Sequence, residues 1–499
     1  MGLYTRITRD WLESRFSQRS AEGVYLAHMP IYGVGEADCE DNHLGRLARL
    51  LRILQQLDGW TFDSLLDVGG AEGYLPWLAR TLYGAEVVST DLSQQACVRA
   101  GELFEVAAAA VDCHRLPFAD DSFDVVVCSE VIEHVEHPVE TMLELQRVAR
   151  AAVVLTTEEV HHDRDWIDQY LFRRPGWPHM ERNVFHPDDL SMCFPGAKLL
   201  PQCDAQPTLA PPSREEARAW LLDHMTADAP APGRHGIVVA DVLNDEARRP
   251  RRHDDAALLD KLLDATIQKG AEGGGPPPIS SLLPRLRDPD SGTSLSAAAG
   301  WLSAADGGRF PLREGVVDFV RLDRPPSTRS ELMERLRRQC PDRADAMIAL
   351  HDRLDLPERW TQDVFDFRRR ADRRGFWSND ELQPRDGGQG FSWRSVGADP
   401  WVVTPCLQRP VREVHLELRI HAPDSAATEG TGQVFWKGGA DVSFDEGRSV
   451  YFSVPNDGQI HVHRVVLAEH PLLPDEVQWL RIDPVNGPCE VDLLSLRLA

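Results

Sequence analysis

A glycine-rich loop is the first stretch whose residue types and spacing could support chemistry. It spans residues 67–73 (DVGGAEG), after the apolar run 65–68 and before a stretch with helical spacing. Glycines in such a turn let the backbone approach a ligand closely, in conformations that a side chain would hinder. The next apolar run ends at Asp91, where a carboxylate can accept hydrogen bonds from both hydroxyls of a ribose. Together these residues predict a nucleoside-binding site.

A second polar group follows the apolar run 123–128 and consists of Ser129, Glu130, Glu133 and His134. Helical spacing would place Glu130, Glu133 and His134 on one face. Glu133 or His134 could then act as a general base toward a hydroxyl. Two carboxylates and an imidazole could instead hold Mg²⁺ or Mn²⁺, because these ions prefer such ligands to thiolates. In a third interpretation the same residues only tie the helix to neighbouring loops.

The elements that must position these residues are predicted by the apolar pattern. Near-continuous apolar runs at 65–68, 86–90, 123–128 and 152–155 indicate parallel strands that are buried on both faces. Stretches with helical spacing lie between them, at 74–82, 94–103 and 139–148. This alternation predicts an α/β doubly wound sheet. The apolar run 236–243 is expected to add a late strand.

The stretch from about residue 60 to 160 resembles class I S-adenosylmethionine-dependent methyltransferases. The resemblance rests on the loop, on Asp91 and on the run VDCHRLPFADDSFDVVVCSEVIEH, which contains the patterns D-x-x-x-L-P-F, F-D-x-V and E-x-x-E-H in order. It implies a Rossmann-like fold. It also implies that S-adenosylmethionine is held by Asp67, Gly69, Gly70, Gly73, Asp91, Leu92, Asp112, Cys113 and Ser129.

The same resemblance implies a role for each part of this site. The loop would shape the methionine end, Asp91 would hold the ribose, and Asp112 and Cys113 would border the adenine. Ala71 stands where the family usually has glycine, and its small methyl group is compatible with an intact loop. Two helices are expected within residues 5–57, where they either cover the edge of the sheet or form a lid over the cofactor.

The E-x-x-E-H arrangement resembles two groups that bind a divalent ion there, ubiquinone-pathway O-methyltransferases and plant small-RNA 2′-O-methyltransferases. Metal-independent relatives carry the same letters. Mg²⁺ is therefore a possible second cofactor that the sequence does not decide. Glu130, Glu133 and His134 are the candidate catalytic residues.

Composition narrows the function further. The formal charge of −25 argues against binding nucleic acid through its phosphates, which needs Lys and Arg. No run of 18 apolar residues and no signal peptide are found, so we expect a cytoplasmic protein without a membrane span. The nine cysteines are scattered without a CxxC pair, which indicates reduced thiols.

Residues 282–320 resemble the small zinc ribbon that activates some tRNA and protein methyltransferases. Pro289, Gly307, Phe310, Pro311 and Gly315 match its pattern. The four cysteine positions instead hold Asp288, Ser291, Ser303 and Asp306. Zinc in such a site needs thiolate or imidazole ligands, so we expect no zinc and a metal-free scaffold or docking surface.

The C-terminal part changes to an alternating pattern. Val414, Leu416, Leu418 and Ile420 alternate with polar residues, which predicts an antiparallel β-sandwich. It resembles carbohydrate-binding-like modules attached to bacterial glycosyltransferases and surface-glycan enzymes. Aromatic side chains could stack on sugar rings or belong to the core; the candidates are Trp393, Trp401, Trp436 and Tyr451.

The expected domains are a helical cap (1–58), a methyltransferase domain (59–245), a linker (246–280), a ribbon-like segment (281–323), a helical segment (324–373) and a β-sandwich (374–499). The sequence predicts an enzyme that O-methylates a sugar, glycan or glycosylated intermediate in surface-polysaccharide biosynthesis, with glycan-biosynthesis enzymes as expected partners. Methylation of nucleic acid or protein is one alternative. A non-catalytic glycan-binding or scaffold protein with an inactive methyltransferase domain is another.

Overall fold

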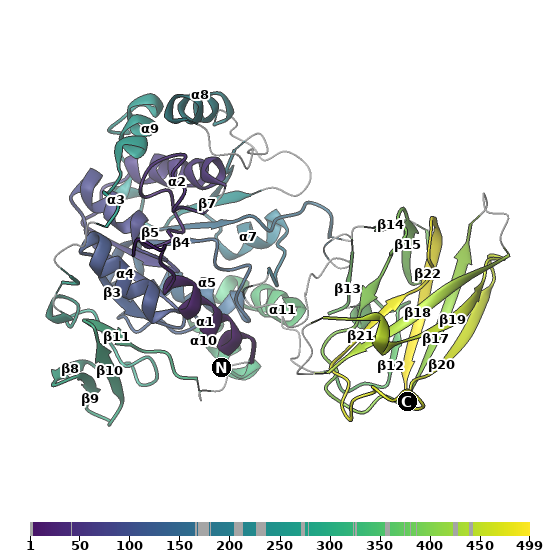
Figure 1. The fold of residues 1–499 in the computed structure, drawn as a ribbon. Helices are drawn as coiled ribbons and strands as arrows, with labels where there is room; N and C mark the ends of the chain where they lie inside the picture. The colour runs from purple at the N-terminus through teal and green to yellow at the C-terminus, as the bar shows by residue number, and fades with distance from the viewer. Residues whose placement is uncertain are drawn as a thin grey trace. The chain divides into compact units, whose positions relative to one another are not determined.

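The computed structural model describes residues 3–40, 42–164, 167, 179, 181–203, 213–225, 236–270, 275–277, 279–322, 324, 327–354, 360–373, 375–379, 381–385, 387–422, 428–438 and 443–499. The chain forms two compact units, each with its own core (Figure 1). The first comprises Met1–His162 and Phe185–Asp355, and the second comprises Asp163–Val184 and Leu356–Ala499.

The first unit is built on a sheet in the order β6-β7-β5-β4-β1-β2-β3, continued beyond β3 by four further strands. The parallel strands are β1 (Ser64–Val68), β2 (Glu86–Asp91), β3 (Ala107–Ala110), β4 (Phe123–Ser129) and β5 (Ala149–Thr157). The predicted late strand is β7 (Ile237–Val242), which runs antiparallel between β5 and β6 (Lys198–Pro201). The doubly wound, Rossmann-like sheet is thus confirmed.

Helices cover both faces of this sheet because its strands are apolar on both sides. One face packs against α2 (His43–Asp58), α3 (Tyr74–Tyr83), α4 (Gln94–Phe104), α8 (Arg214–His224) and α9 (Asp255–Asp264). The other packs against α5 (Pro138–Val148), α7 (Pro187–Cys193), α10 (Arg329–Gln339) and α11 (Ala344–Leu354).

The stretch 246–280, expected to be a linker, contains α9. Four leucines of this helix are buried in the core: Leu258, Leu259, Leu262 and Leu263. Their helical spacing explains why the stretch folds onto the sheet, although the glycines and prolines that follow it favour a linker by composition.

The ribbon-like segment extends the same sheet. It forms β8 (Leu295–Ala298), β9 (Trp301–Ala304), β10 (Arg309–Arg313) and β11 (Val316–Asp318). Strand β11 pairs in parallel with β3, with Val317 beside Ala109 and Asp318 beside Ala110. The backbone groups along the outer side of β3, which would otherwise form an exposed sheet edge, are therefore paired within the same chain (Figure 1).

The second unit consists of two antiparallel sheets around one core. The six-stranded sheet contains β12 (Val364–Asp366), β14 (Leu382–Pro384), β15 (Phe391–Ser395), β17 (Glu413–His421), β20 (Ile460–Val466) and β22 (Cys489–Leu498). The five-stranded sheet contains β13 (Trp377–Ser378), β16 (Val402–Val403), β18 (Glu429–Lys437), β19 (Ser449–Pro455) and β21 (Trp479–Asp483). Strand β17 buries every second residue, as its alternating sequence predicts.

Among the described residues, no helix is long and apolar enough to cross a bilayer. Seven of the described cysteines are free thiols: Cys39, Cys97, Cys113, Cys128, Cys193, Cys340 and Cys489.

Candidate active site

The glycine-rich loop turns between β1 and α3, where two of its glycines have conformations that other residues rarely adopt. Gly69 has φ of +78°, and a Cβ on it would lie 2.2 Å from Val131 Cγ2. Gly73 has φ of +82°, and its Cβ would lie 2.7 Å from the Cβ of Ala100. Ala71, where the family usually has glycine, is also left-handed at φ of +48°. The loop therefore keeps its turn despite that departure.

Two buried carboxylates line the loop. A Cβ on Gly70 would lie 2.7 Å from Asp67 Oδ2, so the backbone passes directly over this side chain. Burial, with the nearby Asp91, raises the pKa of Asp67 to about 8. Asp91 Oδ2 accepts a hydrogen bond from the amide of Ala71 (3.1 Å), and Oδ1 accepts one from the amide of Ser93 (2.9 Å). These bonds fix the Asp91 carboxylate while each oxygen keeps a second lone pair for a ribose hydroxyl.

Glu72 is a site residue that the sequence did not suggest. Its side chain is fully buried, and Oε1 accepts a hydrogen bond from the amide of Met29 (2.6 Å). Burial raises the pKa of Glu72, although the Met29 amide and Arg99 act in the opposite direction. Glu72 thus attaches the segment between α1 and α2 to the loop.

Helix α1 (Leu3–Phe16) lies over the carboxyl ends of several strands. Thr5 donates to Glu136, after β4, and Arg9 pairs with Asp318, at the end of β11 (2.7 Å). Glu13 accepts hydrogen bonds from the region after β2: the hydroxyl of Ser93 and the amides of Gln94 and Gln95. Of the two expectations for residues 5–57, α1 fits the lid, whereas α2 packs on a face of the sheet.

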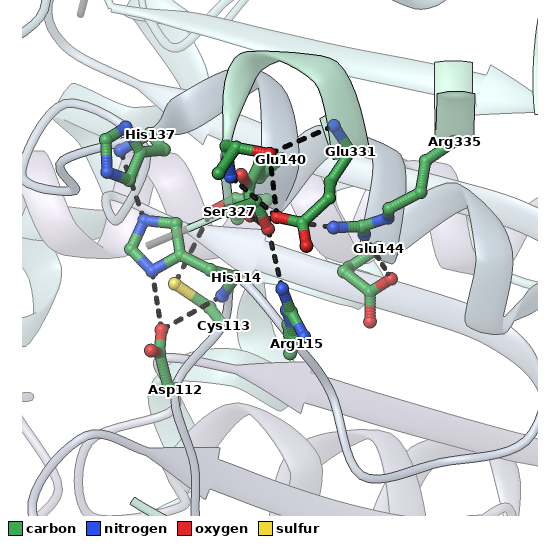
Figure 2. A network of polar contacts seen from close by, with 12 residues as sticks. Asp112, Cys113, His114, Arg115, His137, Glu140, Glu144, Ser327, Glu331 and Arg335 are labelled. Atoms are coloured by element: carbon green, nitrogen blue, oxygen red, sulfur yellow. Dashed lines mark hydrogen bonds and ion pairs between the residues drawn. The ribbon is translucent and has the colours of Figure 1, made fainter. Parts of the chain in front are cut away.

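The expected adenine side carries a compact polar cluster after β3 (Figure 2). Ligand-type atoms of Asp112, Cys113 and His114 lie within 4.8 Å of one another, a spacing that could hold a metal. However, His114 Nδ1 is hydrogen-bonded to Asp112 Oδ1 (2.5 Å). Burial, with Asp112, also raises the pKa of the Cys113 thiol to about 12, so it is protonated near neutral pH. The chemistry of this cluster fits a cofactor wall better than a metal centre.

The cluster continues into helices on the same face of the sheet (Figure 2). The amide of His137 points at His114 Nε2 (3.1 Å), and this contact favours a neutral ring. Burial also lowers the pKa of His114, but the nearby carboxylates outweigh it and raise the pKa to about 8. Ser327 accepts from Arg115 (2.8 Å) and donates to Glu140 on α5 (3.2 Å). The residues that precede α10 are thus bonded to the wall of the expected adenine site.

The prediction that Glu130, Glu133 and His134 share one face of a helix is wrong. Residues 130–137 form turns, and α5 begins only at Pro138. Glu130 has φ of +55°. Its side chain accepts hydrogen bonds from three neighbours: Thr156 Oγ1 (2.7 Å), Gln202 Nε2 (2.8 Å) and the amide of Glu158 (3.1 Å). Glu130 therefore ties the end of β4 to neighbouring strands.

Glu133 and His134 remain near each other, with His134 Nε2 3.9 Å from Glu133 Oε1. Glu133 is 2% exposed, and burial, together with Glu130, raises its pKa well above the ordinary value. The His134 side chain is 13% exposed and that of Glu133 only 2%, so of the two candidate bases His134 is the more accessible to an acceptor hydroxyl. In the described part of the chain, the ligand-type atoms of Glu130, Glu133 and His134 do not all three lie within 4.8 Å of one another.

The remaining predicted cofactor residues lie at strand ends. Leu92 follows β2 directly and is half-buried. Ser129 ends β4, and its hydroxyl is 2.9 Å from Thr156 Oγ1.

In the ribbon-like segment a polar network includes three of the four positions where the ribbon pattern has cysteine. Asp288 Oδ1 accepts the amides of Asp290 (2.8 Å) and Ser291 (3.2 Å). Hydrogen bonding, chiefly from Ser291, lowers the pKa of Asp306. Ser303 lies on β9 opposite Arg309 of β10. These hydrogen bonds close the loops that a metal would otherwise hold together.

Residues 66–155 match the family described as methyltransferase domain. A chain of the complex between the Haloferax volcanii Trm112 methyltransferase activator and a methyltransferase is 16% identical, over 42% of this chain and 99% of that one, with a TM-score of 0.27. Geranyl diphosphate C-methyltransferase from Streptomyces coelicolor is 15% identical, over 48% and 98%, with a TM-score of 0.30. An Aquifex aeolicus methyltransferase is 15% identical, over 39% and 89%, with a TM-score of 0.25.

No curated protein matches the sequence. The family match spans β1 to β5 and includes the glycine-rich loop, Asp91 and the turn after β4. The chain carries a class I S-adenosylmethionine-dependent methyltransferase domain.

Proposed function

We propose that this methyltransferase transfers a methyl group to a hydroxyl of a sugar, glycan or glycosylated intermediate in surface-polysaccharide assembly. The methyltransferase domain is given by the family match. The acceptor class rests on one observation in the second unit, a row of polar and aromatic side chains on one face of the five-stranded sheet.

This row consists of residues that alternate with the core. Gln433 lies between Asp483 and Tyr451 on neighbouring strands, and Phe435 lies beside Arg481. The intervening residues Val434, Trp436, Leu480 and Ile482 belong to the core of the unit. Alternation in a strand puts these two sets on opposite faces.

Gln433, Phe435 and Asp483 are themselves buried, so the part of the row that a saccharide can reach is Tyr451 with the partly exposed Trp401 and Arg481. A sugar presents a rim of hydroxyls and an apolar C–H face, which planar polar groups and aromatic rings complement. Tyr451 is 58% exposed and donates a hydrogen bond to Glu446 (3.0 Å). Trp401 packs edge-on against Trp377 with ring centroids 4.3 Å apart. Arg481 lies over Trp401 and forms an ion pair with Asp483 (2.7 Å).

Two aromatics expected to bind sugar are excluded from that role. Trp393 is 2% exposed, and Trp436 is fully buried. Both belong to the core of the second unit, so their alternate interpretation as core residues holds. Trp401 and Tyr451 remain the candidates.

The residues of the first unit fit S-adenosylmethionine. The glycine backbone passes over Asp67 without room for a Cβ, and Asp91 has both oxygens fixed by amides. S-adenosylmethionine, when bound, supplies an activated methyl group. The chain's own residues then have three tasks: Asp91 holds the ribose, α1 excludes water, and His134 accepts the proton of the acceptor hydroxyl at an imidazole nitrogen.

Radiolabelled methyl transfer to separate pools of sugar nucleotides, glycolipids, protein and RNA tests this proposal. Label in the sugar or glycolipid pool is the expected result, with a loss of about 10²- to 10⁴-fold for His134→Ala. Tyr451→Ala should weaken binding of the labelled glycan without changing affinity for S-adenosylhomocysteine. Label in protein or RNA would overturn the acceptor class. Label in no pool, with the cofactor bound, would favour a non-catalytic protein.

A further inference from the structure

Three arginines gather near the cofactor loop without being used by the roles assigned above. Arg15 comes from α1, and Arg46 and Arg49 come from α2. Arg46 and Arg49 are three positions apart, which places them on one side of the helix. The exposed fractions of their side chains are 30%, 14% and 10%, respectively. They are therefore largely removed from water.

Their contacts place two of them between the cofactor loop and the ends of β4 and β5. Arg46 Nη1 donates to the carbonyl of His28 (2.5 Å), and the next residue, Met29, donates to Glu72 at the end of the loop. Arg49 Nη1 lies 3.2 Å from Glu158, after β5, and 3.7 Å from Glu130, after β4. The methionine end of the cofactor and the acceptor are expected in this same region.

Among the described residues, these arginines pair with three acids, Glu40, Glu130 and Glu158. Arg15 and Arg46 share Glu40, with Arg46 Nη2 2.7 Å from its Oε2. The nearest acid to Arg49 is Glu158, whose side chain is 53% exposed. Glu130 already accepts three hydrogen bonds from other groups. In the described part of the chain, Arg49 makes one hydrogen bond, which leaves most of its five N–H donors for a ligand.

The three arginines also repel one another, which favours the binding of an anion between them. Burial and the neighbouring Arg46 lower the pKa of Arg15. Burial and Arg49 lower the pKa of Arg46 to about 10. Glu40 offsets part of this repulsion between Arg15 and Arg46. A ligand anion would offset more of it, because guanidinium groups bind carboxylate and phosphate with paired hydrogen bonds.

We propose that Arg46 and Arg49, assisted by Arg15, bind the anionic group of a ligand in the methyltransferase site, a carboxylate or a phosphate. Two ligands could supply it, the methionine carboxylate of the cofactor or an acidic sugar or sugar phosphate as acceptor. The second source rests on the proposed function and narrows it to charged acceptors.

Calorimetry on the full-length protein distinguishes the two sources. The variants are Arg46→Gln, Arg49→Gln and the conservative Arg49→Lys, with Arg337→Gln on the exposed side of α10 as the matched control. The probes are S-adenosylhomocysteine and 5′-methylthioadenosine, which keeps the nucleoside but has no carboxylate. Glucuronate, glucose 1-phosphate and neutral glucose are then titrated into the protein saturated with S-adenosylhomocysteine. Circular dichroism melting establishes that each variant is folded.

If the cofactor supplies the anion, Arg46→Gln and Arg49→Gln lower the affinity for S-adenosylhomocysteine by roughly tenfold or more and leave the affinity for methylthioadenosine unchanged. If the acceptor supplies it, both nucleosides bind normally, while glucuronate or glucose 1-phosphate binds the wild type and is lost in these variants. Arg49→Lys should lose less than Arg49→Gln, because it keeps the charge.

Unchanged affinity for every probe in folded Arg46→Gln and Arg49→Gln proteins would overturn the anion site. This readout does not depend on methyl transfer. Anion binding that depends on these arginines, with label transferred to protein or RNA, would retain the anion site and reject the sugar acceptor. Label transferred to sugar, with no effect of Arg46→Gln or Arg49→Gln on binding, would reject the anion site and retain the sugar acceptor.

Discussion

Replacing Asp91 by Asn is the sharpest test of the cofactor site, because both oxygens of this carboxylate are already committed to amide donors. Oδ2 accepts from Ala71 and Oδ1 from Ser93. An asparagine has one oxygen, so its amide nitrogen would face one of these N–H groups, donor against donor. The variant therefore disturbs the loop or the start of α4 as well as removing a charged acceptor from the ribose.

The expected loss follows from two contributions. A hydrogen bond to a charged group is worth about 1.5–3 kcal/mol, and a buried donor left without an acceptor costs about 1–3 kcal/mol. Allowing for relaxation, we expect a loss on the order of 2–4 kcal/mol, or roughly 30- to 1,000-fold in affinity for S-adenosylhomocysteine.

Titration calorimetry at pH 7.5 measures this loss directly. Asp475→Asn, at an exposed position in the second unit, is the matched control and should bind as the wild type does. Asp91→Ala should lose affinity as well, because it also removes the ribose acceptor. Affinity within twofold of the wild type in folded Asp91→Asn protein would refute the assignment of Asp91 to the ribose.

Three further predictions concern pH, the lid and metals. Burial raises the pKa of Asp91 to about 6, so its negative charge is lost below that pH. The affinity for S-adenosylhomocysteine should therefore fall from pH 7 to pH 5, and an affinity that does not change with pH would contradict this. Arg9→Ala removes the link from α1 to Asp318 and should weaken cofactor binding several-fold in calorimetry, whereas unchanged binding would argue against a lid. Methyl transfer should survive EDTA, and elemental analysis should find no stoichiometric zinc; one zinc per chain or loss of activity with EDTA would reverse these expectations.

The sequence predicted the strands well where burial leaves a strong chemical pattern. Valine- and leucine-rich runs become β1, β4 and β5, because strands covered on both faces are apolar throughout. Strand β3 was missed because it consists of four alanines. Alanine has little preference for strands, so β3 is held by its pairing with β2 and β11 rather than by local preference.

The loop residues could be predicted from sequence, whereas their supports could not. Glycine at a tight turn leaves a local pattern, and Gly69 and Gly73 do have positive φ. The contact of Glu72 with Met29 joins residues 43 positions apart, and no local pattern indicates it. The sequence did contain a signal against a helix at Glu130. Proline is favoured in the first turn of a helix and disfavours helix in the residue before it, so Pro138 indicates that the helix begins there.

The ribbon-like segment explains how a site at the carboxyl ends of the strands can depend on residues two hundred positions away. Its β11 pairs with β3, so Asp318 lies at the same sheet edge as Asp91 and receives Arg9 from α1. The residues that follow lead to Ser327, which is bonded to Arg115 beside the expected adenine wall. A zinc ion would add only a local restraint on the loops of the ribbon, where Asp288 and Ser291 already make hydrogen bonds. What the site needs from the ribbon is the paired strand and its carboxylate, and both are independent of a metal.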